Sequence, residues 1–217
     1  GGVDGTIALA PRNGGQGFEV ALTANDATFP GATPIAINEA TINASGFFGQ
    51  GNSTVTGTIR AAGINYGTLF IGRLAANAQV TNGRGSFEAA LAGRRGSRFN
   101  LQLAGDIAPE RIAVAARGDY AGREISMPRR AVLLKTPDGG WALQKTQLSF
   151  GGGFVIAEGR FGGDEPARGR ISLADMPLSL LDVVSGDMGL GGTISGIVDL
   201  GSGPGGVPTG EARVMVD

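Results

Sequence analysis

The sequence predicts an all-β protein built on a long antiparallel sheet. The first observation behind this prediction is a period of two, in which apolar and polar residues alternate through most of the chain. Such alternation places one set of side chains on each face of a strand. The second observation is that Gly residues and Asn-Gly pairs recur between the alternating segments. These residues adopt the positive φ that hairpin turns need. Glycine accounts for 40 of the 217 residues, roughly 2.5 times its usual share.

The alternating segments recur about every 10 to 15 residues, which predicts roughly a dozen strands. Near Ile37 the phase of the alternation shifts before Ala40, and this shift predicts a β-bulge. The positions predicted to share a face are Phe18, Val20 and Leu22; Val55, Gly57, Ile59 and Ala61; the even positions from Phe70 to Val80; Phe99, Leu101, Leu103 and Ile107; Ile112, Val114 and Ala116; Ile194, Val198 and Leu200; and Ala212, Val214 and Val216.

Turn signals separate these strands, and no stretch of the chain has the composition of a domain linker. The loosest segment, residues 201–208, is short enough to be a hairpin loop. We therefore expect residues 1–217 to form a single segment. The chain starts with Gly-Gly and ends in a strand-like pattern, so we interpret it as part of a longer protein. The turn signals are Asn13-Gly14-Gly15, Asn82-Gly83 and residues 93–96, 137–140 and 162–164.

One short helix is predicted near the end of the chain. Pro177 suits the first position of a helix, where a missing N–H costs nothing, and Asp175 precedes it as a possible cap. Leu178 and Leu181 fall on one stripe, and Gly186 is a natural stop. About nine residues are too few for a stable isolated helix. The leucines are therefore expected to dock on an apolar part of the β structure.

Composition excludes several classes of function. The chain has no Cys and no His, which excludes thiol nucleophiles, catalytic triads based on His and His-metal sites within it. The net charge of -1 gives no overall field that attracts nucleic acid. No apolar run reaches the ~18 residues that a membrane-spanning helix requires. We expect no enzyme activity, no cofactor and no metal site.

Three motifs could carry chemistry, and each has a simpler interpretation. The glycines of 151–153 are not followed by Gly-Lys-Ser/Thr, so a turn is favoured over a phosphate loop. Asp164 and Glu165 lie between Gly and Pro, which favours a solvated loop over a catalytic pair. The basic clusters could contact lipid head groups or an acidic partner, but charged hairpin tips that block edge pairing are favoured. These clusters are Arg94, Arg95 and Arg98, and Arg129 and Arg130.

The apolar faces could fill a closed sandwich or barrel, or they could line an open groove for acyl chains. The inward set mixes Ala, Gly, Val, Ile and Leu with few aromatic residues, and a closed core usually needs more bulk. This composition slightly favours the groove. The residues predicted to line it are Phe99, Leu101, Leu103, Ile112, Val114, Ile194, Val198 and Leu200.

The segment "MPLSLLDVVSGDMGLGGTISGIVDLGSGPGGVPTGEARVMV", residues 176–216, resembles a recurrent unit of the TamB and AsmA-like family. The shared order is a Pro-Leu-x-Leu-Leu helix, a Gly-x-Gly-Gly-Thr-Ile-Ser-Gly strand, a loop with Pro and a Gly-x-Ala-x-Val strand. The specific match covers about a fifth of the chain, from Pro177 to Val214. About half of the chain has a looser similarity, and residues 1–95 share only the glycine-rich strand character.

The resemblance implies a sheet rolled into a U, the β-taco, whose apolar groove carries phospholipid acyl chains between the inner and outer membranes. Leu178 and Leu181 would cap part of this groove, and the glycine pair 191–192 would let the chain bend back into the sheet. The implied setting is the periplasmic segment of an inner-membrane-anchored protein that supports outer-membrane biogenesis with the barrel protein TamA. No nucleic-acid partner is expected. Two alternatives remain: a scaffold that assists outer-membrane barrel proteins or autotransporters by strand pairing, and a closed adhesin-like sandwich.

Overall fold

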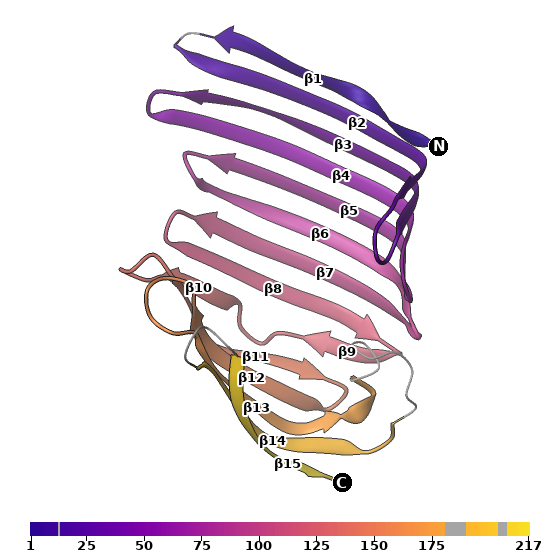
Figure 1. Ribbon diagram of the computed structural model, residues 1–217, viewed down its shortest axis with the longest axis vertical. Helices are drawn as coiled ribbons and strands as arrows, with labels where there is room; N and C mark the ends of the chain where they lie inside the picture. Colours follow the sequence, from indigo (N-terminus) through magenta and orange to yellow (C-terminus); the bar gives the residue numbers. More distant parts are fainter. Residues whose placement is uncertain (13, 181–189, 204–207) are drawn as a thin grey trace. The chain divides into compact units, whose positions relative to one another are not determined.

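The computed structural model describes residues 1–12, 14–180, 190–203 and 208–217. These residues form fifteen antiparallel strands and one short 3₁₀ turn, so the predicted all-β class is confirmed (Figure 1). The number of strands is slightly larger than the sequence indicates. The chain divides into two compact units, Gly1–Ala108 and Pro109–Asp217, and each is described by itself.

The first unit is a seven-stranded meander in which every strand pairs with its neighbours in the chain. Tight turns join most of these strands, and the predicted Asn82-Gly83 turn is confirmed, with φ values of 51° and 72°. Positive φ at both central residues is typical of the hairpin turn that matches strand twist. The strands are β1 (Gly2–Arg12), β2 (Gly15–Phe29), β3 (Ile35–Gly49), β4 (Asn52–Tyr66), β5 (Leu69–Thr81), β6 (Arg84–Arg95) and β7 (Ser97–Ala108).

The register collects the apolar residues of the first unit on one face, which we call apolar face 1. Residues directly opposite in an antiparallel pair point to the same side, so pairings can be followed from strand to strand. One apolar row crosses all seven strands through Gly5, Leu22, Ile42, Ile59, Ala76, Ala89 and Leu103. The adjacent row on the other face contains Thr6, Ala21, Asn43, Thr58, Asn77, Glu88 and Ala104.

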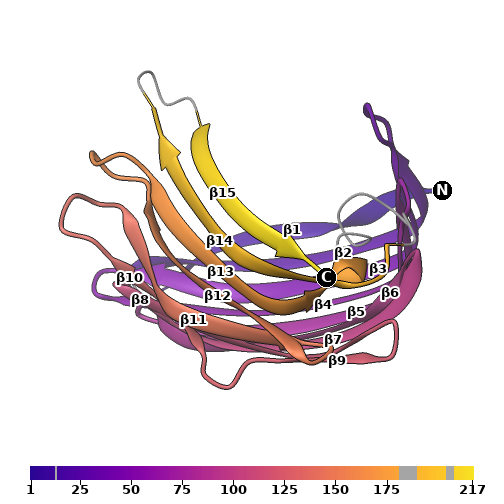
Figure 2. The same ribbon diagram turned by 90° about the horizontal axis from the view of Figure 1, so that it is seen from below.

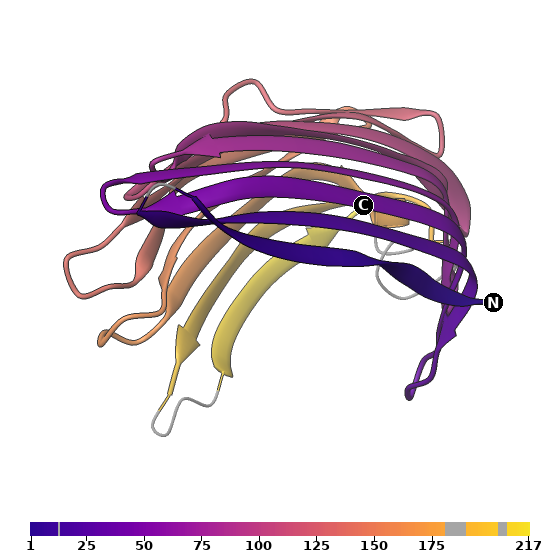
Figure 3. The same ribbon diagram turned by 90° about the horizontal axis from the view of Figure 1, so that it is seen from above.

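A bend crosses β2 to β5 at the place where the sequence predicts a bulge. Asp26 in β2 and Gly63 in β4 have φ values of 46° and 67°, and Asn38 of β3 lies between them. The register is the same on both sides of Asn38, so no strand gains a residue there. The phase shift therefore arises from a bend rather than from the predicted bulge in β3. Figure 3 shows the hairpin end of β2 and β3, in dark purple, turning sharply away from the rest of these strands.

A true bulge lies one strand further along, between Ile71 and Arg73 where β5 pairs with β6. The extra residue moves Phe70 from apolar face 1 to the other face of the sheet. There Phe70 pairs with Arg94, and the Arg94 guanidinium lies 5.1 Å from the centroid of the Phe70 ring. The prediction that Phe70 shares a face with Val80 is wrong for this reason. Ile71 takes its place on the apolar face.

Because of the bend, we expect replacement of Gly63 to destabilise the protein more than replacement of the other glycine in the same strand. We expect Gly63→Ala to lower the free energy of unfolding by about 1–2 kcal/mol, because an L-residue is strained at this φ. The new Cβ would also lie 2.5 Å from the Asn38 side-chain nitrogen. Urea unfolding measures the effect. Gly57→Ala in the same strand is the matched control, because its Cβ would meet no atom closer than 3.7 Å. Equal losses in the two variants would contradict the bend as a strained feature.

The second unit has eight strands, and its sheet order is β8-β10-β11-β12-β13-β14-β15, with β9 pairing to the ends of β8 and β11. Figure 2 shows β11 to β15 side by side. The strands are β8 (Arg111–Tyr120), β9 (Arg123–Ser126), β10 (Ala131–Lys135), β11 (Trp141–Phe150), β12 (Gly153–Phe161), β13 (Arg168–Pro177), β14 (Thr193–Ser202) and β15 (Pro208–Val216).

The second unit also separates its side chains by face, and we call its apolar side apolar face 2. One apolar row runs through Ala157, Ile171, Val198 and Ala212 of β12 to β15. The adjacent row on the other face is Glu158, Arg170, Asp199 and Glu211, a ladder of charged side chains. Within this ladder, Arg170 Nε donates to Asp199 Oδ1 at 2.7 Å. Both side chains are half exposed, so this ion pair adds little stability.

The largest fully buried side chains are Phe150 and Met176, at one end of apolar face 2. Tyr120 is 4% exposed, and its ring centroid lies 6.3 Å from that of Phe150. Among the described residues only seven apolar side chains are buried in the whole chain, and no polar one is. Tyr120, Phe150 and Met176 are therefore the main buried side chains of the second unit.

The predicted helix is not observed where it can be tested. Pro177 is the last residue of β13 and pairs with Thr193, and Asp175 sits inside β13 at a φ of 49° beside a bulge. A proline at a strand end loses no ladder bond, which explains why it is tolerated there. Leu178–Leu180 form the 3₁₀ turn η1. Leu181 and the rest of the predicted helix lie outside the described residues.

The buried cluster predicts a large difference between two phenylalanines of apolar face 2. Phe150→Ala is expected to cost about 3–5 kcal/mol of unfolding free energy, because it empties a packed site. Phe161→Ala is the matched control, since Phe161 is 49% exposed and should cost well under half as much. Urea unfolding of both variants measures the difference. Similar costs would show that Phe150 does not hold the unit together.

Candidate functional site

All eight residues predicted to line a groove lie on the apolar face of their own unit. Phe99, Leu101 and Leu103 follow one another on β7 and lie opposite Gly93, Leu91 and Ala89 of β6. In the second unit the predicted residues are Ile112 and Val114 of β8, and Ile194, Val198 and Leu200 of β14. The strands β8 and β14 are five strand steps apart in the sheet order, roughly 24 Å. The second set therefore marks both ends of apolar face 2 rather than one spot.

Both apolar faces are open over much of their area. Within the described residues, neither unit contains a second layer of strands or an α-helix that could cover a sheet. Ile7 and Leu9 of apolar face 1 are 68% and 69% exposed. The accessible surface is 13,259 Å², against about 9,300 Å² for a compact protein of 21.9 kDa. Such exposure marks an interaction surface when it is contiguous.

Leu178 is 9% exposed, so it is buried, as expected for a residue that docks on an apolar surface. Its backbone N–H donates to the carbonyl of Gly192 at 3.1 Å. Gly192 has a φ of 91° and directly precedes β14, so the chain bends there before it re-enters the sheet. Ser179 accepts a hydrogen bond from Arg123 at 3.2 Å. Leu181, the other residue predicted to cap the groove, lies outside the described residues.

The opposite face of the first unit, which we call polar face 1, contains a hollow of about 600 Å³. The hollow lies over β3 to β7, and its rim carries Arg60, Arg73 and Glu39. Beside it, Arg94 lies directly opposite Arg98. The residues 94–98 do form a basic hairpin tip, as predicted. The sequence pattern did not reveal Arg60 and Arg73, because they are isolated in the sequence and approach this tip only through strand pairing.

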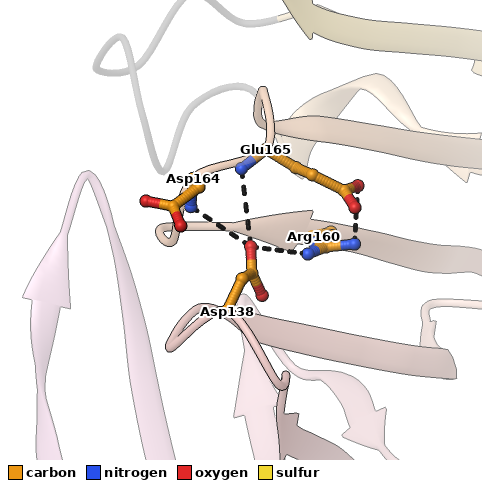
Figure 4. Close-up of polar contacts among 4 residues, drawn as sticks. All are labelled: Asp138, Arg160, Asp164 and Glu165. Atoms are coloured by element: carbon orange, nitrogen blue, oxygen red, sulfur yellow. Dashed lines mark hydrogen bonds and ion pairs between the residues drawn. The ribbon is translucent and has the colours of Figure 1, made fainter.

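A second cluster of charges joins two neighbouring hairpin loops of the second unit (Figure 4). Arg160, from β12, contacts Asp138 Oδ2 through Nη2 and Glu165 Oε2 through Nη1, each at 2.7 Å. The backbone N–H groups of Asp164 and Glu165 donate to Asp138 Oδ2 at 3.2 and 3.4 Å. The acidic pair is therefore part of a structural network. The sequence did not indicate Asp138 or Arg160, which lie 22 positions apart.

This network favours the ionised form of Asp138. The nearby Thr136 hydroxyl and the Arg160 guanidinium, which contacts Oδ2, hold the pKa of Asp138 well below its ordinary value. The side chains of Arg160 and Asp138 are only 17% and 18% exposed, whereas Glu165 is 57% exposed. We therefore expect the Arg160–Asp138 pair to contribute more to stability than the Arg160–Glu165 pair.

The lowered pKa of Asp138 predicts a pH-dependent contribution to folding. The carboxylate stabilises the folded state above the ordinary pKa of about 4, and this contribution is lost as pH falls toward the folded-state pKa. We expect the thermal midpoint of Asp138→Asn to lie below that of the unsubstituted protein at pH 6, with a gap that shrinks between pH 4 and pH 2. Asp164→Asn is the control, because Asp164 joins the network through its backbone N–H. A gap that widens in acid would contradict the assignment.

Other motifs give no chemical centre. Gly151 and Gly152 have φ values of 56° and 96° in the turn between β11 and β12, so the interpretation of this motif as a turn is confirmed. No group of three or more metal-ligating side chains occurs among the described residues. In the same part of the chain, no helix is both long and apolar enough to cross a membrane.

Comparison with known proteins identifies no relative. No protein-family model matches the chain, and no curated protein and no solved structure matches it either. The features that bear on function are therefore the faces of the two sheets and the residues that they carry.

Proposed function

We propose that this chain is a periplasmic conduit segment that carries phospholipid acyl chains between the inner and outer membranes and supports outer-membrane biogenesis. The observation that carries the proposal is the sorting of apolar residues onto one open face in each unit. In this proposal the sheet is rolled into the U of a β-taco, and the apolar faces line its groove. The parent protein is anchored in the inner membrane and acts with TamA, as in the TamB and AsmA-like family that the sequence resembles.

The dimensions of apolar face 1 suit hydrocarbon. Seven strands spaced by about 4.8 Å extend over roughly 29 Å across the sheet. An acyl chain fills one leaflet of the membrane interior, about 15 Å, so it covers about half of this width. Each methylene removed from water gains about 0.8 kcal/mol, and no directional bond is required. A chain can therefore shift along the row from Leu22 to Leu103 without passing a polar side chain.

A second candidate function, strand pairing with an outer-membrane protein, is favoured by β1. This strand has eleven residues, all exposed, and within its unit it pairs only with β2. Its free edge offers unpaired backbone groups that could accept an incoming strand. The acyl-chain function is preferred because edge pairing does not account for apolar residues in the middle of the sheet, such as Ile59 and Leu91.

Photo-crosslinking tests the preferred function. A photoreactive residue at Val198 is expected to capture phospholipid when the protein is incubated with lipid vesicles, with at least a fivefold excess over the same residue at Ile197. Ile197 is the matched control, because it is apolar and 46% exposed yet lies on the opposite face of β14. Mass spectrometry of the crosslinked product measures capture. Leu101 and Gln102 of β7 form a second matched pair in the first unit.

Two outcomes would contradict the acyl-chain function. Equal lipid capture at Val198 and Ile197 would mean that lipid adheres to any exposed side chain. Crosslinks to protein along β1, together with no lipid capture at Val198 or Leu101, would favour the strand-pairing function instead.

A further inference from the structure

Polar face 1 carries a second feature that the acyl-chain function does not use. Two rows of residues form its hollow, and both follow directly from strand pairing. The first row is Glu39, Ala62, Arg73, Ala92 and Asn100 of β3 to β7, and the second is Thr41, Arg60, Ala75 and Ala90 of β3 to β6. The alanines make a floor without side-chain bulk, and the longer polar residues rise around it. The result is a hollow of about 600 Å³.

Four guanidinium groups lie in or beside this hollow, one on each of four consecutive strands. Arg60 and Arg73 belong to its lining, and Arg94 and Arg98 lie next to it on the same face. Three strand spacings separate β4 from β7, and Arg94 lies four residues along β6 from Ala90, which is in the same row as Arg60, so the set extends over about 20 Å. The only carboxylate in the lining is Glu39. Arg94 and Arg98 lie directly across from each other on neighbouring strands. Like charges in this position repel each other, so the pair lowers the free energy of unfolding of the unliganded protein.

Within the described residues the arginines of this set form no ion pair, unlike Arg160 and Arg170 of the second unit. Arg160 and Arg170 each contact a carboxylate at 2.7 Å. Among the residues that the structure describes, Arg60, Arg73 and Arg98 form no ion pair, and Arg94 contacts only the ring of Phe70. Unpaired donors around an uncharged floor are free to bind an anion without first breaking a bond.

We propose that the hollow of polar face 1 binds a ligand that carries two or more phosphoryl groups. Arginine suits this ligand because its planar fork donates two parallel hydrogen bonds to phosphate oxygens. Several phosphoryl groups are required because the arginines are spread over about 20 Å, too far for one group to contact all four. A membrane surface, where neighbouring lipid head groups each present one phosphoryl group, and a soluble oligophosphate both supply several phosphoryl groups. The site is independent of apolar face 1, since it lies on the opposite side of the same strands.

Calorimetric titration with sodium tripolyphosphate tests the proposal. We expect saturable binding to the full chain, and at least a tenfold weaker affinity in the double variant Arg73→Gln/Arg98→Gln. Arg84→Gln is the matched control, because Arg84 lies on the same face of β6 but pairs with Thr81 far from the hollow. Replacing Arg73 and Arg98 by Lys should give an intermediate affinity, since charge is kept and the planar fork is lost.

Thermal unfolding gives a readout that a purely structural role would not produce. Arg98→Gln should raise the midpoint of the free protein, because it relieves the repulsion with Arg94, and should reduce the further rise caused by tripolyphosphate. Cosedimentation with vesicles distinguishes the sources of the ligand. Binding to phosphatidylglycerol vesicles that the double variant loses would assign lipid head groups, and tripolyphosphate binding without vesicle binding would assign a soluble ligand. Unchanged affinity in the double variant, or an equal loss in Arg84→Gln, would overturn the proposal.

Discussion

The structure depends on one constraint, the pleat of antiparallel strands combined with a register that is almost unbroken. In each unit a side chain and its directly opposite neighbours point to the same side. A single apolar row can therefore cross seven strands of the first unit without interruption. A slip of one residue at any pairing would move the following strands to the wrong face. The hydrophobic sorting, the open apolar surface and the basic hollow all follow from this register.

Open apolar surface is costly for a protein in water, and few buried side chains offset that cost here. Among the described residues, the core is limited to seven apolar side chains. Most of the cohesion therefore comes from the backbone ladder and from cross-strand contacts between neighbouring side chains, each of which contributes little alone. An occupant that covers the apolar faces would add the burial that the chain lacks. In the proposed function hydrocarbon is this occupant, because the faces carry few groups that could direct a polar ligand.

Much of the fold could be predicted from the sequence, because alternation and turn residues are local signals. Val198 and Leu200 were assigned to one face on alternation alone, and the register confirms that assignment. Phe70 was misplaced because a bulge between Ile71 and Arg73 changes the phase without any distinctive residue. Pro177 was misread as a helix start because proline is equally compatible with the end of a strand. Ion pairs between residues far apart in the sequence, such as Asp138 with Arg160, produce no repeating pattern along the chain, so the sequence alone could not reveal them.

The central claim is that the apolar faces are open to hydrocarbon, and spin labelling along β14 tests it most directly. The chain has no Cys, so single cysteines can be placed and labelled without a background. Labels at consecutive positions from Ile194 to Leu200 should show oxygen accessibility in the presence of phospholipid that alternates with a period of two. The maxima should fall at Ile194, Val198 and Leu200, on apolar face 2. An accessibility that does not alternate, or maxima at Ile197 and Asp199, would contradict the account.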